Sequence, residues 1–483
     1  MNRSIASLAF SACFGTVIQA QQWVSLQYDF TEQTDIPYGV APGYNGQMDT
    51  LRLDLYLPVC QDSTHTSRRP LAVLAHGGAF IAGSKSEMAS RCRQFAQRGY
   101  VAVSVGYRLG FVSDDVTWSC NINNYSCVFA TDTAEWIRAY YRGIQDFKGA
   151  IRYMVNRADE YQIDPDNVFV VGESAGAFIA LGAAFLDTPS EKPIEAEAID
   201  HAPKPAVFPA MQACPHNQGQ TFANSIPRPD LGDIDGSIEQ PGAPYTIKGV
   251  GNIYGGMFSN LLALEQPDKY KAAIYQFHRP CDLLVPFRQG RVFSGYSWCL
   301  SNCLGCYGIA HTPYMFGSEQ ISIWNSANNY GYPVQNDFTN VSFPFNCLFG
   351  PANCVEQINN PCHALDNPDF RYQRMAEWFA PHISIPIYCV EDTLFVHTVQ
   401  RPDPTLRFSL RPNPAGELLQ LHNTDRAPLR YAITDSQGVI RLNGEIAPGS
   451  FANLSVGHLP AGLYFAIVSD RDGGRAVRSW VRN

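Results

Sequence analysis

Between residues 71 and 186, short apolar runs alternate with stretches of helical periodicity. β-rich runs occur at 71–75, 101–107 and 167–172. A helix is expected over 144–161, because its apolar residues recur at helical spacing along one face: Ile144, Phe147, Ile151, Met154, Ala158 and Tyr161. This alternation predicts an α/β fold, with a mostly parallel sheet and helices on both of its faces.

Three stretches interrupt the rhythm: 112–135, 187–245 and 288–312. The second is the longest, and it is rich in Pro, Gly and polar residues with little periodicity. We interpret all three as irregular insertions in a first domain over 21–395. They are expected to shape a pocket, and the second could cap a cleft. Strand-like and helix-like patterns continue in three further segments, 272–278, 318–331 and 332–339.

The composition changes past residue 390. A Pro-marked linker is predicted at 396–404. From 405 to 483 the sequence consists of short alternating strands and turns, and it contains no cysteine. This pattern predicts a separate all-β sandwich of about eighty residues.

Charge and the N-terminal stretch indicate where the chain acts. Only 16% of its residues are charged and the net charge is −9, which argues against a nucleic-acid partner. Residues 1–20 have the pattern of a secretory signal peptide: Arg3, an apolar run over 5–18, and a small-residue ending at Ala20. No later stretch is apolar enough to cross a bilayer, so no transmembrane segment is expected.

Cysteine usage agrees with export. Fourteen cysteines are present, and all except Cys13 lie between Cys60 and Cys389. In an exported protein this count predicts disulfides, with at least one thiol left over because the remaining number is odd. Zinc is the alternative for the cluster Cys299, Cys303 and Cys306. No nearby His-x-x-His pattern supports zinc, so neither a metal nor a cofactor is expected.

A glycine-flanked serine stands where a strand meets a helix. The strand 167–172 runs into Gly-Glu-Ser-Ala-Gly, and the nearly all-apolar helical stretch 175–186 follows. G-x-S-x-G in this setting is a nucleophile elbow, since a tight turn needs small flanking residues and lifts the hydroxyl clear of the sheet. Ser174 is therefore the predicted nucleophile.

A serine nucleophile needs a place for the developing oxyanion. Strand 71–75 ends in His-Gly-Gly-Ala, where small residues let backbone N–H groups face a reacting carbonyl oxygen. We assign the oxyanion hole to the N–H groups of Gly78, Ala79 and Ala175.

The acid and the base should follow the serine in the order Ser, acid, His. Asp282 comes where the strand-like run of 272–278 has ended, ahead of an apolar-Pro step. His363 follows both the helix and the last strand, so it is the predicted base. His311, which precedes that helix, is the alternative. The gap from acid to base is long, so a Cys-rich insertion must be looped out.

Two cysteines stand directly before the proposed acid and base. Cys281 precedes Asp282, and Cys362 precedes His363. Because acid and base must lie within hydrogen-bond reach, their loops run side by side, and the preceding residues could reach disulfide separation. We predict a Cys281–Cys362 disulfide. The alternative is local pairing of Cys362 with Cys354 or Cys347.

Residues 50–400 resemble the carboxylesterase branch of the α/β-hydrolase superfamily. The matching stretches are LRLDLYLP, HGGAF, RGYVAVSVGYRLG, IDPDNVFVVGESAG and CDLLVPF. The resemblance implies an eight-stranded core sheet and ester hydrolysis. G-E-S-A-G is the form common in type-B carboxylesterases, whereas an Asp as acid is more similar to short bacterial esterases of the hormone-sensitive-lipase and feruloyl-esterase kind.

Residues 405–483 resemble the C-terminal sorting domain of type IX secretion in Bacteroidota. The matching pieces are LRPNPAGELLQL, ITDSQGVI, LPAGLYFAIV and the basic end GRAVRSWVRN. The resemblance implies export across the outer membrane, with the type IX machinery as partner, and a secreted or cell-surface location. A carbohydrate-binding or Ig-like sandwich is the alternative.

These features favour a secreted serine carboxylic-ester hydrolase with a Ser174-His363-Asp282 triad and an acyl-enzyme. One alternative is a peptidase of the prolyl-oligopeptidase kind, although a propeller-sized N-terminal region is missing. Another is a catalytically silent surface-binding protein, which the intact elbow, oxyanion loop, acid and base disfavour.

Overall fold

The computed structural model describes most of the chain, in these ranges: 23–59, 68–112, 130–202, 225–263, 269–295, 311–341, 361–384, 408–411, 415–435, 440–469 and 475–482. The predicted signal peptide and linker lie outside them. The chain divides into two units, Met1–Glu391 and Asp392–Asn483. Each unit is described by itself. Within the described ranges, no helix has the length and apolarity needed to cross a membrane.

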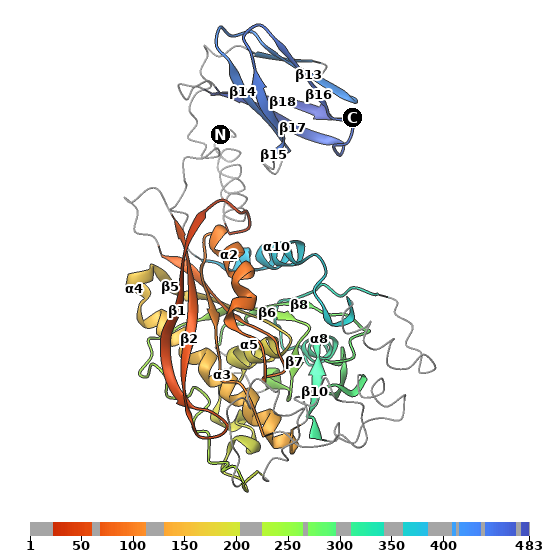
Figure 1. The fold of residues 1–483 in the computed structure, drawn as a ribbon. Coiled ribbons are helices and arrows are strands. Elements are labelled where there is room, and N and C mark those ends of the chain that lie inside the picture. The colour runs from red at the N-terminus through yellow and green to blue at the C-terminus, as the bar shows by residue number, and fades with distance from the viewer. Residues whose placement is uncertain are drawn as a thin grey trace, which may run out of the picture. The chain divides into compact units, whose positions relative to one another are not determined.

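The first unit is built on one eight-stranded sheet (Figure 1), in the order β1-β2-β4-β3-β5-β6-β8-β11. β1 and β2 pair antiparallel, β2 pairs antiparallel with β4, and the remaining neighbours are parallel. The strands are β1 (Asp29–Pro42), β2 (Met48–Val59), β3 (Arg69–Ala75), β4 (Val101–Val105), β5 (Ile163–Glu173), β6 (Ile247–Ile253), β8 (Ala273–Phe277) and β11 (Val334–Asn336).

Helices cover both faces of this sheet. They are α2 (Ala89–Gln97), α3 (Thr133–Asn156), α4 (Ala158–Tyr161), α5 (Ala175–Phe185), α8 (Ser318–Ala327) and α10 (Pro368–Phe379). Successive side chains of a strand point to opposite faces. Leu71 and Val73 of β3 accordingly join the core made with α3 and α5, whereas Ala72 and Leu74 join the core made with α2 and α10. The predicted mostly parallel sheet with two helical layers is therefore present.

Helix α3 departs from its prediction at the N-terminal end. It begins at Thr133, inside the stretch predicted to be irregular, where the Asp132 carboxylate accepts a hydrogen bond from the Glu135 N–H at 3.1 Å. The predicted helix over 144–161 was therefore wrong at its start. It was also wrong at its end, because α3 ends at Asn156 and a separate helix, α4, follows. Every residue from Glu135 to Val155 is buried, and the apolar stripe that the sequence shows from Ile144 onward extends back into the first half of α3 through Trp136 and Tyr140.

The described parts of the insertion 187–245 explain this burial, because they wrap around α3. Arg138, Gln145 and Arg152 extend from α3 and donate hydrogen bonds to backbone carbonyls of the insertion, at 2.7–3.0 Å. The acceptors are Glu195, Glu197, Leu231, Asp233 and Ile238. Long polar side chains thus satisfy loop carbonyls that would otherwise be buried without partners.

The stretch 288–312 is not wholly irregular. Its described part contains β9 (Gln289–Arg291), which pairs with β10 (Tyr314–Gly317), and β10 pairs with β7 (Gly256–Met257). These strands form a separate three-stranded sheet. The prediction missed β9 because three residues are too few to show a strand period.

The second unit contains two antiparallel sheets, β12-β13-β16 and β15-β14-β17-β18. Leu419 and Leu454 of the first sheet share a core with Ile433 and Trp480 of the second. This is the layering of a β-sandwich, as the turn-punctuated pattern predicts. The strands are β12 (Phe408–Arg411), β13 (Leu418–Asn423), β14 (Leu429–Asp435), β15 (Ile440–Ile446), β16 (Phe451–Ser455), β17 (Gly462–Ser469) and β18 (Arg475–Arg482).

Candidate active site

Ser174 lies in the turn between β5 and α5. Its backbone has φ 54° and ψ −120°, a conformation that side chains rarely adopt. A Cβ on Gly172 would lie 2.0 Å from the Gly176 carbonyl oxygen, and a Cβ on Gly176 would lie 2.2 Å from the Ala75 carbonyl oxygen. Both flanking positions therefore require glycine, which is the physical content of the G-x-S-x-G pattern.

The predicted acid and base lie beside this serine. His363 Nε2 is 3.0 Å from Ser174 Oγ, and His363 Nδ1 is 2.7 Å from Asp282 Oδ2. His363 belongs to the short 3-10 turn η10 (Pro361–His363), after α8 and β11 in the chain. His311, the alternative base, instead has Nδ1 3.2 Å from the backbone carbonyl of Ala130. The structure thus brings Ser174, Asp282 and His363 together in one hydrogen-bonded row.

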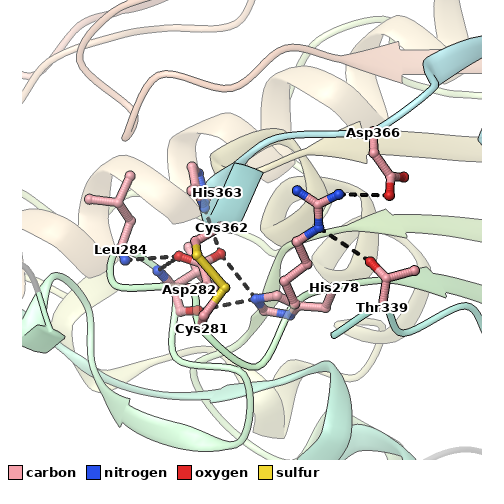
Figure 2. Close-up of a disulfide and its surroundings, with 10 residues drawn as sticks. His278, Cys281, Asp282, Leu284, Thr339, Cys362, His363 and Asp366 are labelled. Atoms are coloured by element: carbon pink, nitrogen blue, oxygen red, sulfur yellow. Dashed lines mark hydrogen bonds and ion pairs between the residues drawn. A yellow bond between two sulfur atoms is a disulfide. The ribbon is translucent and has the colours of Figure 1, made fainter. Parts of the chain in front are cut away.

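The Asp282 carboxylate is held at both oxygens (Figure 2). Oδ1 accepts the N–H groups of Leu284 at 2.8 Å and Val285 at 3.0 Å, while Oδ2 accepts from His363 and, at 3.1 Å, from Nε2 of His278. Burial alone would raise the pKa of Asp282, but the charge of His363 and hydrogen bonds from both histidines lower that pKa to about 2. The carboxylate is therefore ionised at neutral pH. The prediction missed His278.

A disulfide joins the acid loop to the base loop. Cys281 and Cys362 are bonded across 81 residues of sequence, with their Cα atoms 5.4 Å apart. Figure 2 shows the bridge beside the Asp282 carboxylate. This predicted pairing is confirmed. The alternative partners, Cys347 and Cys354, lie outside the described residues.

The ring of Tyr254 packs against the imidazole of His363. Its ring centroid is 4.7 Å from that of His363. Its hydroxyl donates to Glu173 at 3.0 Å, and the same carboxylate accepts from Tyr372 at 3.1 Å and Arg91 at 3.3 Å. Glu173, the residue before Ser174, therefore anchors an aromatic ring against the imidazole. Only the position of Glu173 was visible in the sequence, because its partners come from distant segments.

The three predicted oxyanion residues line the same cavity as Ser174 and His363. Gly78 has φ 110°, and a Cβ there would lie 2.1 Å from the Ala82 carbonyl oxygen. Among the described residues, no group accepts a hydrogen bond from the N–H of Gly78 or Ala79. Ala175 begins α5, and the first N–H groups of a helix have no intrahelical partner. All three N–H groups are thus available to a ligand oxygen.

His76 supports this loop rather than facing the cavity. Its ring stacks on Tyr107, with centroids 4.4 Å apart, and its Nδ1–H donates to the Gly77 carbonyl at 2.7 Å. Burial lowers the pKa of His76 to about 4, so its ring is neutral at pH 7. Neutral His76 fixes the course of the Gly-Gly turn.

The cavity has a volume of about 440 Å³ and a largely aromatic wall. Ser174 and His363 open into it, and the aromatic lining residues are Phe80, Trp136, Phe178, Tyr254, Phe258 and Phe293. Phe293 comes from the stretch 288–312, as expected of a pocket-shaping segment. The described residues of 187–245 cover α3 and are not among the lining residues. Residues 203–224 of this insertion lie outside the described ranges, so its expected role in capping a cleft stays a prediction.

No metal site is found in the described ranges, where no three His, Cys, Asp or Glu side chains are grouped so that they could hold an ion. The cluster Cys299, Cys303 and Cys306 lies outside the described residues.

Parts of this chain match a family model and parts of known proteins. The BD-FAE family model matches residues 138–207, a segment that includes Ser174. The para-nitrobenzyl esterase of Bacillus subtilis is 30% identical over 146 residues, which cover 30% of this chain and 27% of that protein. The cAMP-regulated D2 protein of Dictyostelium discoideum is 28% identical over 170 residues, which cover 33% of this chain and 28% of that protein. This chain is similar to ester hydrolases.

The matches are partial. This chain spans little more than a quarter of the length of these two relatives. Among solved structures, esterase B from Lactobacillus rhamnosis, inhibited by a tributyrin phosphonate, aligns with 78% of this chain and 93% of its own at 14% identity and a TM-score of 0.36. The likeness to the curated esterase covers less than a third of this chain.

Proposed function

We propose that this protein is a serine carboxylic-ester hydrolase. The observation that carries the proposal is the position of His363, with one ring nitrogen 3.0 Å from Ser174 Oγ and the other 2.7 Å from Asp282 Oδ2. A neutral imidazole needs both contacts: an acceptor nitrogen for the serine proton and a donor nitrogen held by a carboxylate.

In the first half of the reaction, Ser174 Oγ attacks the ester carbonyl carbon while His363 Nε2 takes its proton. The developing negative charge on the carbonyl oxygen is stabilised by N–H groups of Gly78, Ala79 and Ala175. The ionised Asp282 stabilises the imidazolium and fixes the ring orientation. His363 then protonates the alkoxide as the C–O bond breaks, which leaves an acyl group on Ser174.

In the second half, water replaces the alcohol. His363 takes a proton from the water as its oxygen attacks the acyl carbon, and the same N–H groups stabilise the second tetrahedral intermediate. The carboxylic acid leaves when Ser174 recovers its proton from His363. The aromatic wall of the cavity favours an apolar substituent on the substrate, because such a group gains by leaving water.

Hydrolysis of a short-chain nitrophenyl ester by Ser174→Ala tests the proposal. Loss of a triad nucleophile costs about a millionfold in kcat in a well-studied protease, and we expect near-complete loss here. The circular dichroism spectrum and melting temperature should stay close to wild type, because alanine is smaller than serine. A folded variant that keeps more than about a tenth of the wild-type rate would contradict the proposal.

For the second unit, we propose a role in export through type IX secretion, with a secreted or cell-surface location. Support comes from the sequence stretches that resemble the sorting domain and from the predicted signal peptide at 1–20. Deleting residues 405–483 should leave ester hydrolysis by the purified protein intact but stop surface delivery in the native host. Normal delivery of the truncated protein would reject this role.

A further inference from the structure

A second histidine contacts the carboxylate of the proposed acid. His278 follows β8 directly and is fully buried. Its Nε2 is 3.1 Å from Asp282 Oδ2 and 3.1 Å from the Val285 carbonyl oxygen, and its Nδ1 is 2.9 Å from Ser318 Oγ. Figure 2 shows His278 and His363 approaching Asp282 from different segments. The mechanism described above makes no use of His278.

The surrounding hydrogen bonds determine which nitrogen of His278 carries its proton. The Gly255 N–H donates to Asn252 Oδ1 at 3.0 Å, which fixes the orientation of that amide. Asn252 Nδ2 must therefore be the donor to Ser318 Oγ, 3.1 Å away. Both neighbours of His278 Nε2, the Asp282 carboxylate and the Val285 carbonyl, only accept hydrogen bonds, so this nitrogen carries a proton. The Ser318 hydroxyl, which accepts from Asn252, can then donate to Nδ1.

Gln276 extends the same buried network. Its Nε2 donates to the Ser318 carbonyl at 3.1 Å, so its Oε1 is the acceptor for Asn252 Nδ2 at 3.0 Å. Asn252 comes from β6, Gln276 from β8 and Ser318 from α8. Three elements of the scaffold thus converge on one imidazole nitrogen. The opposite nitrogen of that ring faces Asp282.

We propose that His278 is a positioning residue for ester hydrolysis: it donates its Nε2–H to Asp282 Oδ2 and so keeps the carboxylate aligned with His363. This inference rests on the proposed function. Asp282 Oδ1 is fixed by two backbone N–H groups, whereas His363 is the other described residue that donates to Oδ2. His363 gains and loses a proton in each cycle and is partly exposed, with 14% of its side-chain surface accessible.

The restraint on Oδ2 is a single hydrogen bond from the His278 ring. The neighbouring cation, Arg279, forms an ion pair with Asp366 at 2.6 Å. Arg279 also donates through Nε to Thr339 Oγ1 at 3.2 Å.

Kinetics of two substitutions separate positioning from packing. His278→Phe fills similar space but has no donor. Its kcat should fall about 10- to 100-fold, the range for losing a hydrogen bond to a charged group, while KM for a nitrophenyl ester stays near wild type. His278→Gln can place an amide N–H near the former Nε2–H, so it should recover much of the lost kcat. His382→Gln is the matched control, because His382 pairs with Tyr270 and lies outside the site.

The outcomes are distinguishable when Ser174→Ala is measured alongside. Wild-type kcat in a folded His278→Phe, with Ser174→Ala inactive, would overturn only the role of His278. Equal losses in the Phe and Gln variants, together with lowered melting temperatures, would also overturn it by showing a purely structural role. Activity of Ser174→Ala at the wild-type rate would reject the proposed function and this inference with it. If His278→Phe does not fold, Ser318→Ala provides the test: a smaller fall in kcat at constant KM supports the role, and no change rejects it.

Discussion

The two halves of the candidate site are held in place in different ways. On the nucleophile side, Ser174 and the Gly78 loop are positioned by the backbone: a strand end, a tight turn and glycines whose Cβ positions are occupied by carbonyl oxygens. On the acid–base side, Asp282 and His363 come from loops 81 residues apart that are joined by a disulfide and by side-chain hydrogen bonds. Local sequence therefore specifies the first half, and tertiary contacts specify the second.

This difference predicts how each half should respond to substitution. Changes on the nucleophile side should alter the reaction directly, because the Ser174 hydroxyl and the N–H groups of the Gly78 loop are proposed to contact the reacting carbonyl. On the acid–base side, loss of the Cys281–Cys362 disulfide should reduce the stability of the protein and the alignment of Asp282 with His363. It should leave the reacting groups themselves intact. We call this disulfide the clamp.

The largest effect is expected for the proposed base. His363→Ala should reduce kcat by about a millionfold, as for the base of a well-studied serine protease. His311→Ala is the control, since His311 contacts the Ala130 carbonyl rather than Ser174. Steady-state hydrolysis of a nitrophenyl ester measures both. Loss of activity in His311→Ala but not in His363→Ala would show that His311 is the base.

A smaller effect is expected for the oxyanion loop. Gly78→Ala places a Cβ against the Ala82 carbonyl and should displace the N–H groups that face the cavity. Losing one oxyanion donor costs about 100- to 1000-fold in kcat. Gly331→Ala is a matched control, because Gly331 also has a positive φ, 79°, but has open space around it. Similar activities of the two variants would remove the Gly78 loop from the mechanism.

The smallest effect on the reaction is expected for the disulfide clamp. Replacing Cys281 and Cys362 together by Ser should lower the free energy of unfolding by about 4 kcal/mol in the chain-entropy model. The reacting groups remain, so kcat should fall far less than for His363→Ala. Cys92→Ala is the control, since Cys92 is a buried cysteine without a disulfide in the described residues. Denaturant titration measures the change in the free energy of unfolding, and initial rates of ester hydrolysis measure the change in kcat. A double variant as inactive as His363→Ala would mean that the disulfide is indispensable to the site.

The sequence predicted much of this arrangement because several of its parts obey local rules. The elbow and the Gly-Gly turn each occupy a few consecutive residues whose small size is required by backbone geometry. The acid and base followed from chain order, and the adjacent cysteines suggested how their loops meet.

What could not be predicted depends on contacts between distant segments. His278 reads as one residue after a buried strand, and only the fold brings Ser318 and Asn252 to its other nitrogen. The burial of the polar side of α3 could not be predicted either, because the insertion that covers this side is remote in sequence. In both cases a polar side chain is buried beside a partner that is remote in sequence, and periodicity carries no information about such a pair.

Covalent labelling with a fluorophosphonate tests the central claim most directly, because the reagent reacts with an activated serine and marks its position. We predict one equivalent of label per chain, recovered by mass spectrometry on the peptide that contains Ser174. Labelling should be abolished in Ser174→Ala and strongly slowed in His363→Ala. Label recovered on a different residue, or rapid ester hydrolysis by a protein whose Ser174 stays unmodified, would contradict the account.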